Sequence, residues 1–158
     1  IDIKNKRFLN NEIVADLIIK SSKLQGVELD KEIAKLMIDE YPILSVAASF
    51  AKSPSIFRGL KELKIKESNR LELIYLNLIK CGVSCEVKND DLYIYPNKEY
   101  TVKDSNIITK FDHRIAMAFS VMGTRLNENL KILESECIST SFPNFLKSFN
   151  SVGGQLIE

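Results

Sequence analysis

The stretch Phe111-Asp112-His113-Arg114-Ile115-Ala116-Met117-Ala118-Phe119-Ser120-Val121-Met122-Gly123 predicts a helix with polar chemistry in its first turn. Asp112 suits the N-cap position, because its carboxylate can accept the free backbone N–H groups of the next turn. Apolar residues recur at helical spacing to form an inward stripe, which consists of Ile115, Ala118, Phe119 and Met122. Gly123 is expected to end this helix in a left-handed conformation.

His113, the only histidine of the chain, and Arg114 follow the cap directly. They therefore lie at the positive end of the helix dipole, where a cation costs up to about 1 kcal/mol. The position of Arg114 is explained if an anion binds between it and the helix end, because a guanidinium matches carboxylate or phosphate bidentately. The alternative is an ordinary surface arginine on a capped helix.

The composition is that of a globular protein and excludes several classes of partner. The chain has 158 residues, of which 45% are hydrophobic and 27% charged, enough to bury a core in one domain. A net charge of +1 argues against nucleic-acid and membrane-surface partners, so an anion site must be made locally. There is no apolar run of about 20 residues and no signal peptide, so we expect a cytoplasmic protein.

The cysteines do not indicate a metal site. The chain has three cysteines, an odd number, and they lack CxxC spacing: Cys81, Cys85 and Cys137. Its single histidine supplies at most one further ligand for a zinc site. We predict free, buried thiols and no bound metal. The chain begins with Ile1 rather than Met, which suggests a processed product or an excised piece of a longer protein.

The remaining pattern alternates strands with helices. Strands are expected at residues 1–4, 14–20, 55–60, 83–87, 92–95, 129–134 and 155–157, with 83–87 and 92–95 forming a hairpin. Helices are expected at 43–52, with Pro42 in the first turn, at 71–79, stopped by Gly82, at 112–123, and from Ser141 through Phe149. Residues 5–11 are expected to form a polar turn, and residues 21–30 are expected to be irregular.

The chain contains a possible internal repeat, in which similar residues recur about 73 positions apart. It matches Asp39 with Asp112, Ser68 with Ser141, and residues 56–60 with 129–133. The four matched polar residues are each expected to cap a helix. The sequence therefore predicts an α/β fold of duplicated units, approximately residues 33–97 and 106–158, whose helix N-termini share one anion-attracting edge.

Ionisable residues gather within one turn of these predicted caps. The group consists of Asp39, Lys66, Glu67, Arg70, His113 and Arg114. Its three fixed cations suit the anions of a phosphorylated substrate, and its two carboxylates suit proton transfer. The alternatives are a solvated charge run for Lys66 and Glu67, and a cap alone for Asp39.

Four motifs resemble a known family in their order and spacing, and the resemblance extends over nearly the whole chain. They are Ile38-Asp39-Glu40-Tyr41-Pro42, Lys66-Glu67-Ser68-Asn69-Arg70, Asp112-His113-Arg114-Ile115-Ala116-Met117-Ala118 and Thr140-Ser141-Phe142-Pro143. The chain resembles the C-terminal part of the 5-enolpyruvylshikimate-3-phosphate synthases (3-phosphoshikimate 1-carboxyvinyltransferases). The resemblance implies the enolpyruvyl transferase fold, an inside-out α/β barrel. Such an enzyme has two domains of three βαβαββ units each, with the active site in the cleft between them. Residues 1–158 would supply about two of the three C-terminal units.

The implied reaction transfers the enolpyruvyl group of phosphoenolpyruvate to the 5-hydroxyl of shikimate 3-phosphate through a tetrahedral intermediate. It belongs to chorismate and aromatic amino acid biosynthesis, and the resemblance implies no metal or organic cofactor. By resemblance, Asp39 takes the proton of the 5-hydroxyl and holds the shikimate ring. Lys66 contacts the 3-phosphate, and Glu67 is the acid/base at the methylene carbon. Arg70 and Arg114 hold phosphoenolpyruvate, with His113 supporting them.

The chain also departs from the family pattern. Asn69 stands where the family often has Asp, and Thr140 where some members have a Lys that contacts phosphoenolpyruvate. The family's N-terminal motifs, which form the opposing wall of the cleft, have no counterpart here. We therefore expect the isolated chain to fold without turnover and to need the missing N-terminal domain.

Two other functions remain open at this point. One is a non-catalytic domain that binds anions or docks a partner on the same scaffold. The other is a relative of the enolpyruvyl transferase that acts on UDP-N-acetylglucosamine. The combination of Lys-Glu-Ser-x-Arg with Asp-His-Arg favours the shikimate enzyme over that relative.

Overall fold

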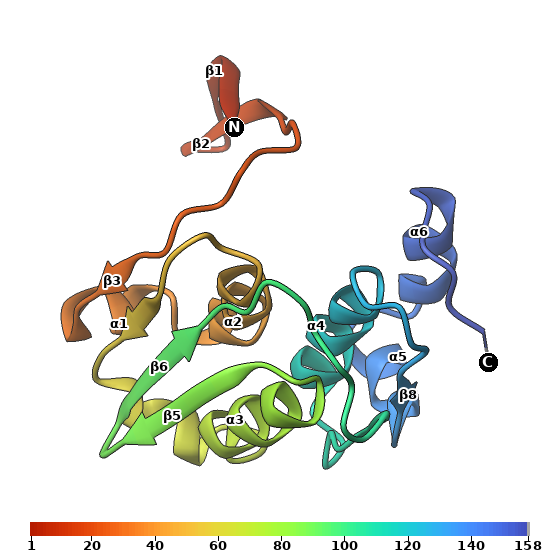
Figure 1. Ribbon diagram of the computed structural model, residues 1–158. Helices are drawn as coiled ribbons and strands as arrows, with labels where there is room; N and C mark the ends of the chain where they lie inside the picture. Colours follow the sequence, from red (N-terminus) through yellow and green to blue (C-terminus); the bar gives the residue numbers. More distant parts are fainter. Residues whose placement is uncertain (158) are drawn as a thin grey trace.

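The computed structural model describes residues 1–157, and its core lies where two helices cover a four-stranded sheet (Figure 1). Helices α2 (Tyr41–Ser49) and α3 (Arg70–Lys80) pack on the sheet, and α4 (His113–Gly123) packs on α2. The buried stripe of α4 contains the four residues expected from the sequence, which are Ile115, Ala118, Phe119 and Met122. The predicted α/β class is confirmed.

The sheet has the order β3 (Glu28–Leu29), β4 (Ser55–Phe57), β6 (Asp91–Tyr95) and β5 (Ser84–Lys88). Strands β3 and β4 are parallel, and the other neighbours are antiparallel. The predicted hairpin is confirmed as β5 and β6. Strand β3 lies in a segment that was expected to be irregular. The sequence did not predict this strand because it has only two residues and pairs with β4, which is distant in the sequence. Asp30 then caps helix α1 (Lys31–Leu36).

The ends of the two central helices have local causes. Pro42 lies in the first turn of α2, as predicted, because a proline there loses no helical hydrogen bond. This helix ends at Ser49, earlier than expected. Past the end of α3, Gly82 has a φ of +81°, and a Cβ there would lie 2.3 Å from the carbonyl oxygen of Thr101. Gly82 therefore stops the helix as predicted.

The second half begins with another parallel pair, β7 (Asn106–Ile107) and β8 (Lys131–Ile132), which flank α4 in the sequence. Helices α5 (Ile138–Ser141) and α6 (Phe145–Ser151) follow. The predicted strand 129–134 is thus shorter than expected, and the one at 155–157 is wrong because those residues pair with no strand of residues 1–157. Gly123 does not adopt the predicted left-handed conformation, because backbone hydrogen bonds continue the turn through Leu126.

The order of elements is compatible with repetition. Residues 28–95 run strand, helix, strand, helix, strand, strand, with α1 and α2 sharing the first helical position. Three 3-10 helices, η1 (Ile38–Glu40), η2 (Leu60–Ile65) and η3 (Ser135–Cys137), intervene. The second half starts in the same way with β7, α4 and β8. The division into units at 33–97 and 106–158 stays a prediction.

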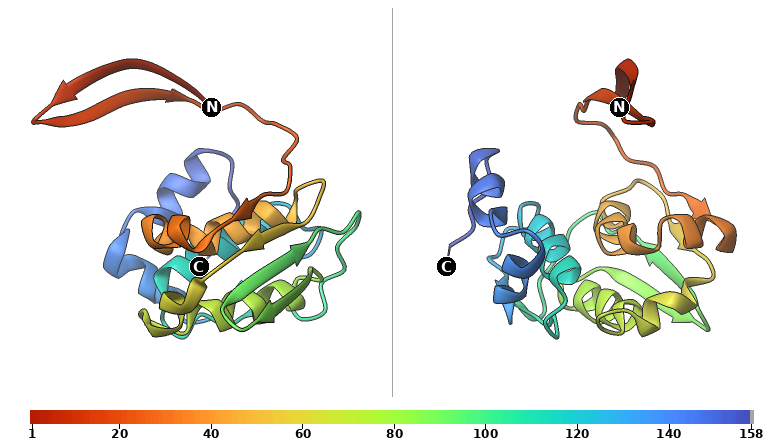
Figure 2. Two further views of the ribbon diagram at one scale, coloured as in Figure 1. Left: turned by 90° about the vertical axis from the view of Figure 1, so that its left-hand side faces the viewer. Right: turned by 180° about the vertical axis from the view of Figure 1, so that it is seen from behind.

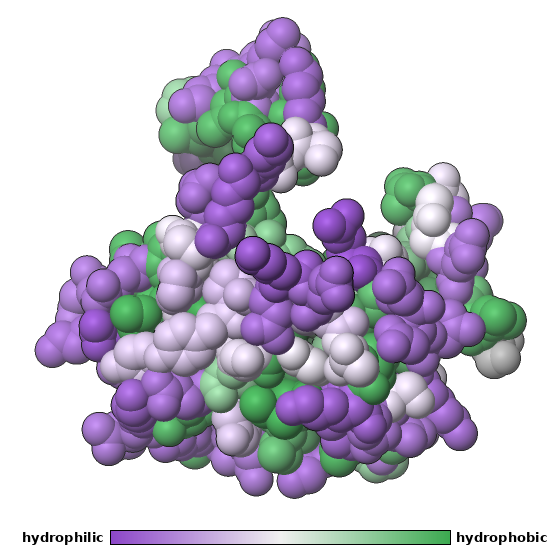
Figure 3. Space-filling model, in the orientation of Figure 1, coloured by the Kyte–Doolittle hydropathy of each residue, from purple (hydrophilic) through white to green (hydrophobic). Residues whose placement is uncertain are grey.

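Strands β1 (Asp2–Leu9) and β2 (Glu12–Ile18) form a hairpin that projects from the rest of the molecule (Figure 2). Its turn consists of Asn10 and Asn11, both left-handed, so the broad turn predicted for residues 5–11 is wrong. Asparagine tolerates that conformation, which lets the strands continue to the tip. The hairpin surface mixes hydrophobic and hydrophilic residues (Figure 3). Phe8 and Ile13, both exposed, are partners across the two strands.

Candidate functional site

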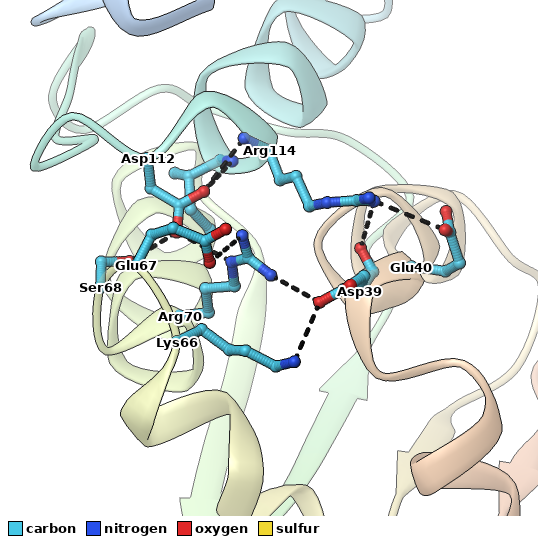
Figure 4. Close-up of polar contacts among 9 residues, drawn as sticks. Asp39, Glu40, Lys66, Glu67, Ser68, Arg70, Asp112 and Arg114 are labelled. Carbon is cyan, nitrogen blue, oxygen red and sulfur yellow. Dashed lines mark hydrogen bonds and ion pairs between the residues drawn. The ribbon is translucent and has the colours of Figure 1, made fainter. Parts of the chain in front are cut away.

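The N-terminal ends of α3 and α4 meet around the carboxylate of Asp112, which is fully buried (Figure 4). Its Oδ1 atom accepts hydrogen bonds from the backbone N–H groups of Arg114 and Ile115, at 3.0 and 3.4 Å, so the predicted cap is confirmed. Its Oδ2 atom accepts from Ser68 Oγ at 2.9 Å and from Arg70 Nε at 2.8 Å. One carboxylate thus caps α4 and joins it to the start of α3.

The Arg70 guanidinium lies among three carboxylates and has no exposed surface. Besides the bond to Asp112, its Nη1 atom donates to Asp39 Oδ1 at 2.8 Å. Its Nη2 atom lies 2.5 Å from Glu67 Oε2, an ion pair without hydrogen-bond alignment. The resemblance, by which Arg70 and Arg114 both hold phosphoenolpyruvate, predicts that both guanidinium groups are open to a ligand. Arg70 does not meet this expectation, because its charge is enclosed by its partners.

Asp39 connects this cluster to the start of α2. Its side chain is 43% exposed, and its Oδ1 atom lies 3.4 Å from Lys66 Nζ as well as close to Arg70. Partial burial by itself would raise the pKa of Asp39, but the contact and charge of Lys66, with the charges of Arg114 and Arg70, lower the pKa below its usual value. Asp39 is therefore ionised at neutral pH.

Arg114 is the partly exposed arginine of the cluster, with 35% of its side chain accessible. Its Nη1 atom donates to the backbone carbonyl of Asp39 at 3.0 Å and to Glu40 Oε1 at 3.4 Å. The contact with Glu40 was not expected from the sequence. The sequence did contain a signal for this contact, because Glu40 directly follows Asp39 in the motif Ile38-Asp39-Glu40-Tyr41-Pro42.

The other predicted site residues differ in their contacts. Glu67 is 52% exposed and Lys66 29% exposed, so both can reach a ligand from the start of α3. His113 lies half-buried in the first turn of α4, and its side chain makes no hydrogen bond within residues 1–157. The structure thus brings Asp39, Lys66, Glu67 and Arg114 together around buried Arg70, with His113 next to them in sequence.

Three of the four predicted caps are wrong. Asp39 lies in η1, ahead of α2, where its carboxylate binds cations instead of backbone N–H groups. Asn69 rather than Ser68 caps α3, because Asn69 Oδ1 accepts from the N–H of Glu72 while Ser68 turns toward Asp112. Ser141 is the last residue of α5, so it ends a helix rather than starting one.

A cavity of about 240 Å³ opens beside this cluster between α2 and α4. Asp39, Glu40 and Arg114 form its polar wall. The apolar wall consists of Pro42, Ile43, Met117, Ala118, Val121 and Phe145. Of these three polar residues only Arg114 is a cation, so its partly exposed guanidinium is the group on this concave surface that can bind a small anion.

The described residues do not form a metal site, and their thiols are free. Among residues 1–157, no group of three or more histidine, cysteine, aspartate or glutamate side chains is placed to hold a metal ion. The predicted thiols are free, with Cys81 and Cys137 buried and Cys85 partly buried, and burial raises the pKa of Cys81 and of Cys85 to about 12. No helix within residues 1–157 is long and apolar enough to cross a membrane.

Comparisons with known proteins show the family to which the chain is similar. Residues 7–149 match the family model "EPSP synthase (3-phosphoshikimate 1-carboxyvinyltransferase)". The chain is 45% identical over 145 residues to the 3-phosphoshikimate 1-carboxyvinyltransferase of Paramagnetospirillum magneticum, covering 92% of the chain and 32% of that protein. It is 42% identical over 144 residues to the enzyme of the same name from Clostridium tetani, covering 91% and 33%. The chain thus spans about a third of the length of these relatives.

The fold of the chain is also similar to that of solved structures. The EPSP synthase of Acinetobacter baumannii superposes with a TM-score of 0.89 at 32% identity, over 98% of this chain and 36% of that one. An enolpyruvyl transferase of Streptomyces tendae, NikO, superposes with a TM-score of 0.63 over 98% of this chain and 33% of its own. At 15% identity the second likeness concerns the fold alone.

Proposed function

The chain belongs to the EPSP synthase family, and from this premise we propose that it is the C-terminal part of an enzyme that acts on shikimate 3-phosphate and phosphoenolpyruvate. The enzyme transfers the enolpyruvyl group to the 5-hydroxyl and releases inorganic phosphate. The observation that carries the proposal is the meeting of Asp39, Glu67 and Arg114, from three separate segments, at one cluster. Such a set supplies an anion site and two carboxylates for proton transfer.

In the proposed reaction Arg114 and Lys66 bind the anions of the substrates. Both side chains are partly exposed, and both contact Asp39, so a phosphate or carboxylate group can share their donors. Asp39 accepts the proton of the 5-hydroxyl and orients the shikimate ring. Its lowered pKa keeps it in the ionised form that accepts a hydrogen bond from a hydroxyl.

Glu67 exchanges a proton with the methylene carbon of phosphoenolpyruvate. Its exposure of 52% leaves one side of the carboxylate open to a ligand. Arg70 holds Glu67 and Asp39 in place, and it reaches phosphoenolpyruvate itself only when the ligand displaces one of those carboxylates. His113 supports Arg114 from the same helical turn.

The isolated chain is proposed to bind substrates weakly and not to turn over. The cluster has an open side, and stabilising the transition state requires donors on both sides of a site that excludes water. The partner is the remaining two thirds of the enzyme, including an N-terminal domain. Residues 1–158 would then form one part of the C-terminal domain.

The test is to place residues 1–158 in the Paramagnetospirillum magneticum enzyme, in exchange for the matching third. We expect this fusion to release phosphate from phosphoenolpyruvate only when shikimate 3-phosphate is added, and we expect none from the isolated chain. A folded fusion without turnover would contradict the proposed function. Turnover with UDP-N-acetylglucosamine instead would favour the related transferase, and turnover by the chain alone would contradict its dependence on the missing part.

A further inference from the structure

The turn that precedes α4 is held in an unfavourable conformation. Lys110 and Phe111 both have left-handed backbones, with φ values of 49° and 59°, and the N–H of Asp112 donates to the carbonyl of Thr109 at 3.0 Å. A left-handed conformation is unfavourable for an L-residue because it crowds the Cβ atom against the backbone, and it is rare for a bulky side chain such as phenylalanine. Two such residues in succession require compensating contacts.

Glu134, which lies between β8 and η3, supplies those contacts. Its Oε2 atom accepts from Thr109 Oγ1 at 3.0 Å, from the N–H of Lys110 at 3.2 Å and from the N–H of Thr109 at 3.4 Å. Hydrogen bonds to an ionised acceptor are about twice as strong as neutral ones. Glu134 is itself left-handed, with a φ of 49°, and Thr109 is fully buried. The Glu134 carboxylate thus accepts three hydrogen bonds from the strained turn.

The position of this turn connects it to the candidate site. Asp112, its last residue, both caps α4 and binds Arg70, and Arg114 follows two residues later. Glu134 makes no hydrogen bond to Asp39, Arg70 or Arg114 in the described part of the chain, so any effect on them passes through the turn. We propose that Glu134 is a positioning residue, which holds Thr109 and Lys110 so that Asp112 and Arg114 keep their places. Its consequence for catalysis rests on the proposed function.

The first test measures geometry and does not depend on activity. In the 158-residue chain, Glu134→Gln removes the charge while keeping the size of the side chain. The backbone N–H groups of Arg114 and Ile115 donate hydrogen bonds to Asp112, and we expect their hydrogen exchange to become about tenfold faster. The exchange of the backbone N–H of Leu78 in α3 should stay unchanged. The matched control is Glu136→Gln, which removes an exposed carboxylate two residues away. Unchanged exchange, or an equal change throughout the protein, would overturn the proposal.

The second test asks whether the turn mediates the effect. In the fusion enzyme, Glu134→Gln is expected to raise the KM for phosphoenolpyruvate about tenfold and to change kcat much less. Adding Phe111→Gly should recover most of this loss, because glycine adopts the left-handed conformation without penalty. Failure of the glycine to restore either KM or the exchange rates would also overturn the proposal. A fusion that is inactive in every variant counts against the proposed function alone, because the exchange rates decide the positioning role.

Discussion

The Nε atom of Arg70 donates to Oδ2 of Asp112 over 2.8 Å, and neither side chain has any exposed surface. This ion pair links the first residue of α3 to the N-cap of α4, 42 positions away in the sequence. The other guanidinium nitrogens of Arg70 contact Asp39 and Glu67, which lie at the open side of the cluster. The pair thus anchors the two carboxylates proposed to transfer protons.

The buried ion pair is expected to make a large contribution to stability. Asp112→Asn should lower the free energy of unfolding by about 3 kcal/mol, because Arg70 then loses its fully buried counter-charge and keeps the partly exposed Asp39 and Glu67. Asparagine caps helices as well as aspartate, so the loss reports the pair rather than the cap. Urea unfolding measures it, with Asp30→Asn at the exposed cap of α1 as the control, expected to change stability by less than about 0.5 kcal/mol. Equal effects of both substitutions would contradict this assignment.

The same pair predicts a loss of stability in acid. Burial alone would raise the pKa of Asp112, but Arg70 and Ser68 bind its ionised form and lower the pKa below the ordinary value of 3.8. Because the folded pKa is lower than the unfolded one, the stabilisation is present above about pH 4 and is lost as the pH falls through the folded pKa. The urea midpoint should fall over this interval, and it should fall less in Asp112→Asn. Parallel curves for the two proteins would show that Asp112 does not contribute.

Arg114 is expected to be the main anion contact of the chain. Arg114→Lys keeps the charge but loses the planar fork, so it should weaken binding of phosphoenolpyruvate to the fusion enzyme about tenfold or more, since hydrogen bonds to charged groups contribute roughly 1.5–3 kcal/mol. Arg7→Gln, on the projecting hairpin, removes a whole charge and should leave the affinity unchanged. Calorimetric titration measures both variants. Unaltered affinity in Arg114→Lys would remove the assignment.

Glu67 is expected to act on the rate rather than on binding. Glu67→Gln in the fusion enzyme should lower kcat by about 100- to 10,000-fold, the usual contribution of general acid/base catalysis, with little change in substrate affinity. Glu62→Gln, in nearby η2, serves as the control and should keep normal turnover. Steady-state kinetics separate the two parameters. Near-normal kcat in Glu67→Gln would exclude a proton-transfer role.

The projecting hairpin is expected to contribute little to the stability of the rest of the chain. Within the described residues, no hydrogen bond joins residues 1–20 to residues 21–157. Deleting residues 1–20 should therefore shift the thermal unfolding midpoint by less than about 2 °C, which corresponds to roughly 0.5 kcal/mol for a domain of this size. Circular dichroism at 222 nm, in the helical band, follows the transition. A much larger fall would mean that the hairpin packs on the body in solution.

Several parts of the fold could be read from sequence because their causes are local. The cap at Asp112, the proline in the first turn of α2 and the glycine stop after α3 each involve contacts within a few residues. The hairpin of β5 and β6 is likewise closed by a short turn at Asn89. The motifs also identified the residues of the candidate cluster, although not how they contact one another.

Tertiary structure decided which partners these residues have. Asp39 and Ser68 have side chains suited to capping, yet Asp39 binds Arg70 from 31 positions away and Ser68 binds Asp112 from 44. Likewise, Arg70 looked like an open anion contact, and the structure encloses it completely. A cap is chosen by the few residues that follow it, whereas an ion pair depends on which helix ends meet and how much water they exclude. Those two conditions exist only after distant segments have packed together.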